Sequence, residues 1–307
     1  MNACMRAVTR HGLQRGLQVF GVREGYDGLI RGDLVRLSAR DVGNVIQRGG
    51  TVLGSSRSRE FRTPAGREAA ARSLQDAAID GLVVCGGNGT CAGALALAEQ
   101  WSGGIIAIPA SIDNDINGTD TTVGYDTAIN TALEAIDRIR DTAEAQERIF
   151  LVEVMGRGCG AIALDVALAG GAVAALVPEA PVDLDALLRL LTTWRDAGRR
   201  SMIIIVAEGE EHGGAFEVAR RLQPHVPTDI RVTVLGHIQR GGAPTAASRI
   251  LATRLGVAAV DALLDGATSV MVGLKGNQVT LVPLHEAVAA QRPADAAMLQ
   301  IIGGLAG

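Results

Sequence analysis

The sequence predicts a doubly wound, mainly parallel α/β fold, and its 307 residues suit one large domain or two of ordinary size. Short apolar runs alternate with longer Ala- and Leu-rich stretches, and a strand followed by a helix, repeated, is the pattern of such folds. The apolar runs are continuous rather than alternating, which is typical of strands buried on both faces of a parallel sheet. Polar loops follow several of these runs, where such folds bind ligands.

The expected strands are short and rich in Val, Ile and Leu, and they cover residues 17–22, 81–87, 104–109, 148–154, 174–178, 202–209 and 231–237. The expected helices lie at 66–78, 125–140, 184–197 and 246–264. The chain has only two Trp, two Tyr and four Phe residues, so we expect aliphatic side chains to build the core.

Composition and charge exclude several classes of protein. A net charge of -4 argues against a nucleic-acid-binding surface. No apolar run reaches the length of about 18 residues that a membrane-spanning helix needs. The first residues lack the apolar stretch of a signal peptide. The scattered cysteines form no paired framework, which is typical of the reducing cytoplasm; they are Cys4, Cys85, Cys91 and Cys159.

Four polar loops directly follow expected strands. They are GGNGT (86–90), PASIDND (109–115), EVMGRGCG (153–160) and GHIQRGG (236–242). One such loop alone would be an ordinary turn more often than a site. Four loops rich in Gly, Arg and Asp at the carboxyl ends of strands favour a ligand site over turn chemistry.

The second loop brings Asp113 and Asp115 close together beside Ser111. Its pattern partly matches a calcium-binding loop, but residue 124 is Gly where that loop needs Glu, and a strand rather than a helix precedes it. The carboxylates are better explained by a phosphoryl group nearby. One of them can then accept a hydroxyl proton while another holds Mg²⁺.

The first loop can approach a phosphate closely, because glycines expose backbone N–H groups and a helix is expected to start near Thr90. An ordinary strand-to-helix turn stays open as the alternative. Arginine suits bidentate phosphate contacts. The candidate arginines are Arg57, Arg62, Arg148, Arg157, Arg231 and Arg240.

Together these motifs resemble the 6-phosphofructokinases, and in particular the ATP-dependent bacterial type. PASIDNDINGTD is similar to the family's Pro-x-Thr-Ile-Asp-Asn-Asp segment, EVMGRGCG to its Glu-Val-Met-Gly-Arg segment, and RVTVLGHIQRGG to its Gly-His-x-Gln-Arg-Gly-Gly signature. GYDTA, RGGTVLGSSR and AEGE also fit. The likeness runs in the family's order from Met1 to about residue 295.

The resemblance implies two doubly wound, mainly parallel α/β domains. Residues 1–124 plus about 237–287 would form a nucleotide-binding domain, and 125–236 plus about 288–307 a sugar-phosphate-binding domain. It implies phosphoryl transfer from ATP to the 1-hydroxyl of fructose 6-phosphate, with Mg²⁺, in an allosteric, cytoplasmic homotetramer of glycolysis.

The resemblance also implies roles for individual residues. Asp113 would be the general base, Arg157 would stabilise charge on the transferring phosphoryl group, and Ser111 keeps the hydroxyl of the usual Thr. Fructose 6-phosphate would contact these residues, Asp115, Met155, Gly156, Glu208, His237 and Arg240, with Arg148 and Arg231 reaching it across a subunit boundary.

For the nucleotide, the resemblance implies a site made by Tyr26, Arg57, Arg62, Gly86, Gly87, Asn88, Gly89 and Thr90. Asn88 and Asp115 would assist Mg²⁺. A nucleotide effector would bind at Arg6, Arg10, Arg140 and Arg199. Gly89 and Ala110 stand where pyrophosphate-using relatives carry Asp and Lys, and these small residues leave room for ATP.

Two departures from the family pattern keep other functions open. Asn88 replaces an Asp that coordinates Mg²⁺, and the sequence starts at the family's first helix, without the preceding strand and its Gly-Gly-Asp loop. An impaired or non-catalytic paralogue that binds sugar phosphate or an effector is therefore the alternative, and a pyrophosphate-dependent enzyme is a weaker one.

Overall fold

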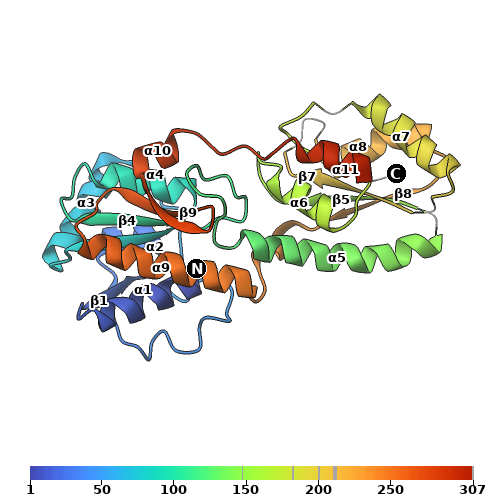
Figure 1. Cartoon of the computed structure of the whole chain (residues 1–307). Helices are drawn as coiled ribbons and strands as arrows, with labels where there is room; N and C mark the ends of the chain where they lie inside the picture. Colours follow the sequence, from blue (N-terminus) through green and yellow to red (C-terminus); the bar gives the residue numbers. More distant parts are fainter. Residues whose placement is uncertain (147, 182, 200, 210–212, 306–307) are drawn as a thin grey trace. The chain divides into compact units, whose positions relative to one another are not determined.

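The computed structural model describes residues 1–146, 148–181, 183–199, 201–209 and 213–305 (Figure 1). The chain folds as two compact units. The first comprises Met1–Ser111, Ile116–Gly124 and Ala243–Gln291, and the second Ile112–Asp115, Tyr125–Gly242 and Arg292–Gly307. Among the described residues, no helix has both the length and the apolar character to cross a membrane.

The first unit is built on a four-stranded sheet with the order β10-β9-β4-β3. Strands β3 (Gly81–Gly86), β4 (Gly104–Pro109) and β9 (Val270–Lys275) are parallel, while β10 (Gln278–Pro283) runs antiparallel to β9. Gly86 pairs with Pro109 at the ends of β3 and β4. The loops that follow these two strands therefore start at the same edge of the sheet.

Helices cover both faces of this sheet. Side chains of β4 alternate between two cores, and Ile105, Ile106, Ala107 and Ile108 are all fully buried. On one face α1 (Asn2–Gln14) packs beside α9 (Ala246–Leu264), as Figure 1 shows. The other face carries α3 (Pro64–Asp76), α4 (Asn88–Leu97) and α10 (Leu284–Ala289).

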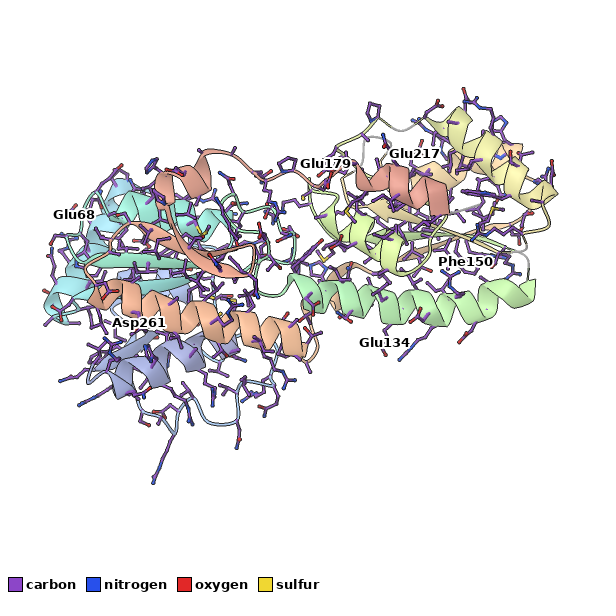
Figure 2. The ribbon with its side chains drawn as sticks, viewed as in Figure 1. Glu68, Glu134, Phe150, Glu179, Glu217 and Asp261 are labelled. Carbon is purple, nitrogen blue, oxygen red and sulfur yellow. The ribbon has the colours of Figure 1, made fainter. Side chains whose placement is uncertain are left out.

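Polar contacts add to the packing of α1 on α9. Asp261, labelled in Figure 2, accepts hydrogen bonds from Nε2 of His11 at 2.8 Å and from Nη1 of Arg15 at 2.5 Å. These groups are partly exposed, so the burial of apolar surface between the helices contributes more than this ion pair.

The predicted strand at 17–22 does form, but outside the main sheet. Its residues make β1 (Val19–Val22), which pairs with β2 (Leu34–Leu37) in a separate antiparallel ribbon. The helix α2 (Gly25–Arg31) connects the two strands, and the short 3₁₀ helix η1 (Glu60–Arg62) leads into α3. An isolated run of four apolar residues does not specify which strand it will join.

The second unit has a fully parallel sheet with the order β6-β7-β5-β8. The strands are β6 (Ala174–Leu176), β7 (Met202–Ala207), β5 (Ile149–Val154) and β8 (Ile230–Val234). All residues of β7 are buried, as the continuous apolar run predicts for a strand covered on both faces.

Two helical layers enclose this sheet, and both can be followed in Figure 1. On one face lie the long helix α5 (Tyr125–Gln146), α6 (Ala161–Ala169) and α11 (Met298–Leu305). On the other lie α7 (Leu184–Asp196) and α8 (Ala215–Leu222), which the 3₁₀ helix η2 (Gln223–His225) follows. The doubly wound α/β class predicted from the sequence is confirmed.

The structure differs from the expected boundaries at the end of one strand and at three segments of the division into two units. The strand expected at 231–237 ends at Val234, and Gly236–Arg240 form a 3₁₀ helix, η3. Residues 112–115 and 237–242 belong to the second unit rather than the first, and 288–291 belong to the first. One cause is local bonding, because the carbonyl of Asp115 accepts the Arg292 N–H within the second unit at 2.9 Å.

Candidate active site

Three neighbouring strands of the second unit end in candidate residues. Met155, Gly156 and Arg157 directly follow β5, and Glu208 follows β7. His237 and Arg240 lie in η3, just beyond the end of β8. Because β7, β5 and β8 are parallel and adjacent, the structure brings these side chains to one edge of the sheet. This is where doubly wound folds bind ligands.

The turn that carries Arg157 has an unusual backbone. Arg157 is in the left-handed region with φ 58°, which a side chain larger than Asn or Asp seldom adopts. The surroundings require glycine at two positions, since a Cβ at Gly156 would clash with the carbonyl of Cys159 and one at Gly209 with the carbonyl of Arg157. Strain of this kind persists where the structure fixes a functional side chain.

The loop after β4 places two acidic side chains in a buried setting. Asp113 and Asp115 are 7% and 6% exposed. Burial, and next the neighbouring Asp115, raise the pKa of Asp113, whereas Arg240 and Arg157 act against this rise and Glu208 adds to it. Residues from the loop itself, from the turns after β5 and β7, and from η3 thus all act on the Asp113 carboxyl group. A raised pKa suits a base that must accept a proton near neutral pH.

In the first unit, the GGNGT loop opens α4 directly at Asn88, two residues before the expected start. The Gly87 carbonyl accepts the N–H groups of Thr90 and Cys91 at 2.9 and 3.1 Å. A Cβ at Gly86 would lie 2.7 Å from the Cβ of Thr90, so only glycine fits there, while the space around Gly89 is open. The loop therefore offers a helix N-terminus with uncrowded backbone, which suits an anion.

Tyr26 supports this loop, and Thr122 supports the loop after β4. The hydroxyl of Tyr26 donates to the carbonyl of Thr90 at 2.7 Å, and its ring stacks on Phe61 at 3.8 Å with an interplanar angle of 9°. Burial raises the pKa of this phenol, so it stays protonated as a donor. Thr122, which no sequence motif marks, donates from Oγ1 to the carbonyl of Ser111, in the loop after β4, at 2.6 Å.

Comparison with known proteins now decides the family. The family model described as phosphofructokinase matches residues 1–263. A protein of Thermus thermophilus named ATP-dependent 6-phosphofructokinase 1 is 53% identical over 301 residues, which cover 98% of this chain and 94% of that protein. The chain belongs to the phosphofructokinase family.

Other phosphofructokinases extend the comparison. ATP-dependent 6-phosphofructokinase 2 of Bacteroides thetaiotaomicron is 45% identical over 98% of this chain and 93% of its own length. The T-state structure of Pichia pastoris phosphofructokinase matches with a TM-score of 0.89 and 38% identity over 94% of this chain, which spans only 34% of that longer chain. A pyrophosphate-dependent enzyme of Marinobacter aquaeolei, at 23% identity and a TM-score of 0.85 over 98% of this chain and 84% of its own, shares the fold.

Two arginines expected at the phosphofructokinase substrate site lie elsewhere in this chain. Arg148 immediately precedes β5, and Arg231 is the second residue of β8, paired in register with Phe150 (Figure 2). Both are at the amino ends of their strands, opposite the end that carries Met155. Arg231 donates from Nη2 to Asp229 at 2.9 Å. The structure therefore does not bring them to the edge that holds Arg240.

The arginines expected for the effector and the nucleotide occupy separate surroundings. Arg6 and Arg10 lie on α1 in the first unit, whereas Arg140 and Arg199 belong to the second. Arg140 donates to the carbonyl of Gly170, and Arg199 lies over the ring of Trp194 at 5.6 Å. In the first unit, Arg57 and Arg62 are exposed in the segment that leads to α3.

No cluster of three or more His, Cys, Asp or Glu side chains that could hold a metal occurs in the described part of the chain. Mg²⁺ commonly uses one or two carboxylates plus substrate phosphates. The donor set of the expected ligands, one carboxylate at Asp115 and one amide at Asn88, fits an ion that arrives with the nucleotide.

Proposed function

We propose that this chain transfers the γ-phosphoryl group of ATP to the 1-hydroxyl of fructose 6-phosphate, forming fructose 1,6-bisphosphate and ADP. The observation that carries the proposal is the buried Asp113, whose pKa responds to Arg157, Glu208 and Arg240 at the edge where three parallel strands end. The relatives named ATP-dependent 6-phosphofructokinase, at 53% and 45% identity, support the same reaction.

The acceptor chemistry rests mainly on the second unit. Asp113 takes the proton of the 1-hydroxyl while the hydroxyl oxygen attacks the γ-phosphorus. The proton stays on the Asp113 carboxyl until product leaves. Arg157 faces the negative charge that spreads over the transferring phosphoryl group. Met155, Gly156, Glu208, His237 and Arg240 hold the sugar phosphate, and Ser111 adds a hydroxyl beside the base.

The donor is held by the first unit. The N–H groups of Asn88 and Gly89, at the start of α4, face the phosphates, and Gly86, Gly87 and Gly89 keep the backbone accessible. Tyr26 fixes the loop through the Thr90 carbonyl, and Arg57 and Arg62 supply charge on the nucleotide side. The small residues Gly89 and Ala110 favour ATP over pyrophosphate.

Asp115, Asn88 and the phosphates themselves would hold Mg²⁺, and the ion would neutralise the charge of the triphosphate. Asn88 supplies a neutral oxygen where a carboxylate would supply charge, so we expect binding of the ion to depend mainly on Asp115 and on the phosphates. Turnover is compatible with weaker binding of Mg²⁺ at Asn88, because the phosphates supply most of the ligands of such an ion.

We also infer a homotetramer. Arg148 and Arg231 lie at the amino ends of their strands, where they can serve the sugar-phosphate site of a neighbouring copy rather than their own. Arg6 and Arg10 on α1, with Arg140 and Arg199, are the proposed site of a nucleotide effector. All cysteines are free thiols, which supports a cytoplasmic location.

Donor and acceptor specificity test this function. Purified protein is assayed for ADP or phosphate release with fructose 6-phosphate and either ATP or pyrophosphate, with Mg²⁺ present. We expect turnover with ATP and not with pyrophosphate. Binding of fructose 6-phosphate without turnover by either donor would instead establish the non-catalytic paralogue, and turnover with pyrophosphate alone would replace the donor.

A further inference from the structure

Gln239 differs from its neighbours in η3 by being buried. His237, Ile238 and Arg240 are exposed, whereas Gln239 is 1% exposed. A glutamine amide has two donor hydrogens and a carbonyl acceptor, and glutamine is seldom fully buried. Its side chain therefore points into the unit, away from the side chains proposed to bind the sugar phosphate.

The buried amide bonds to two other segments of the second unit. Its Oε1 accepts the backbone N–H of Met155 at 2.8 Å, and its Nε2 donates to the carbonyl of Ala128, in the first turn of α5, at 3.5 Å. The partners fix the orientation of the amide, because an N–H can only donate and a carbonyl can only accept. With the amide oxygen and nitrogen exchanged, the NH₂ group would face the N–H of Met155 and the amide oxygen would face the carbonyl of Ala128.

This bond continues the sheet where backbone pairing stops. The register of β5 with β8 ends at Glu153 opposite Val234, and the Leu235 N–H still donates to the carbonyl of Glu153 at 3.0 Å. Beyond that point the chain coils into η3 and leaves β5. The side chain of Gln239 then supplies the acceptor for Met155 that an extended strand would have supplied from its backbone.

We propose that Gln239 is a positioning residue, which sets the segment carrying His237 and Arg240 against the turn carrying Met155 and Arg157. This inference deepens the proposed function and rests on it. Both segments hold residues proposed to bind the sugar phosphate, and the Gln239 bond joins them directly. The nucleotide residues, in the first unit, are not joined by it.

The primary variant is Gln239→Leu, which keeps a similar volume but removes the acceptor and the donor. The Met155 N–H then loses its partner, and η3 is free to shift against the turn. A lost buried hydrogen bond of this kind corresponds to about a tenfold or greater rise in the KM for fructose 6-phosphate. The KM for ATP should stay within about twofold of the wild-type value, because the Gln239–Met155 hydrogen bond does not reach the proposed nucleotide residues.

A stability-matched control separates positioning from a general loss of structure. Val166 is fully buried in α6, in the core cluster on the α5 face of the same sheet, and none of the proposed site residues belongs to that cluster. Val166→Ala removes two methyl groups from this core and lowers the melting temperature of the second unit. It should leave both KM values unchanged, whereas Gln239→Leu should change one of them.

Gln239→Glu is the second variant, for the case in which the leucine variant does not fold. Its carboxylate keeps an acceptor for Met155 but lacks the hydrogens for Ala128, so we expect a rise in the fructose 6-phosphate KM that is smaller than for leucine. Direct titration with fructose 6-phosphate alone accompanies the kinetics. Wild-type protein that fails to bind this sugar phosphate contradicts the proposed function.

Wild-type binding with an unchanged fructose 6-phosphate KM in Gln239→Leu overturns the positioning role and leaves the proposed function intact. Equal rises in both KM values, matched by Val166→Ala, also overturn it. If only the glutamate variant folds, an unchanged KM for fructose 6-phosphate in that variant has the same meaning. A selective rise in this KM, with the ATP value retained, supports the role.

Discussion

Replacing Asp113 with Asn tests the proposed base with little change in shape. The side chain is 7% exposed and keeps its volume, but the amide cannot accept a proton from the sugar hydroxyl. General-base catalysis is typically worth about 10² to 10⁴-fold. At about 1.36 kcal/mol for each tenfold change, the variant should lose about 2.7 to 5.4 kcal/mol of transition-state stabilisation.

The same substitution should not weaken the fold, which separates catalysis from structure. Folding raises the pKa of Asp113, mainly by burial and next by the charge of Asp115. Such a carboxyl group stabilises the folded state below the pKa of an unfolded Asp, and this contribution is lost as pH rises through the folded value. A neutral Asn avoids that loss, so the variant should be at least as stable as wild type at neutral pH.

The assay couples ADP formation to a spectroscopic signal at saturating ATP and fructose 6-phosphate, beside thermal unfolding of each protein. The acid limb of the wild-type kcat/KM profile, which reports groups of the free protein, should lie above the pH range of an ordinary Asp, because the pKa of Asp113 is raised. A variant that keeps most of the wild-type kcat would refute the role of Asp113. A variant that loses activity and melting temperature together would show that the loss is structural.

Three further substitutions test other parts of the site. Gly86→Ala places a Cβ 2.7 Å from the Cβ of Thr90, so it should raise the KM for ATP and leave the KM for fructose 6-phosphate unchanged. An equal rise of the two KM values would contradict the phosphate-loop role. Arg231→Ala should weaken fructose 6-phosphate binding by roughly 1.5–3 kcal/mol, as for a lost hydrogen bond to a charged group, and full affinity in a monomer would disprove the subunit-boundary role. Asn88→Asp should lower the Mg²⁺ concentration for half-maximal rate, and an unchanged Mg²⁺ dependence would remove residue 88 from the metal site.

The sequence predicted the parallel sheets well because burial on both faces leaves a clear pattern. The four apolar residues 105–108 of β4 alternate between two cores, and no polar position interrupts them. The loops after β3 and β4 follow strand ends at one edge of the first sheet, and those after β5 and β8 at one edge of the second, as expected for parallel strands. Strand partners were harder, and the β1–β2 ribbon shows that a short apolar run carries no information about its neighbour.

Contacts that depend on tertiary placement could not be predicted. The glutamine in GHIQRGG reads as one more polar loop residue, and only the structure shows that its amide is buried against Met155. The run 231–237 has the composition of a strand throughout, but β8 ends at Val234 and the next residues coil into η3. The raised pKa of Asp113 likewise depends on residues that the fold gathers from distant segments.

The most direct test of the proposed reaction is to identify the product. Purified protein is incubated with ATP, Mg²⁺ and fructose 6-phosphate, and the mixture is followed by phosphorus NMR. We predict that one ADP appears for each sugar that gains a second phosphate, and that the new phosphate is on carbon 1. ATP that stays intact while fructose 6-phosphate binds, or a phosphate that appears on another hydroxyl, would contradict the assignment of Asp113 and its neighbours to this transfer.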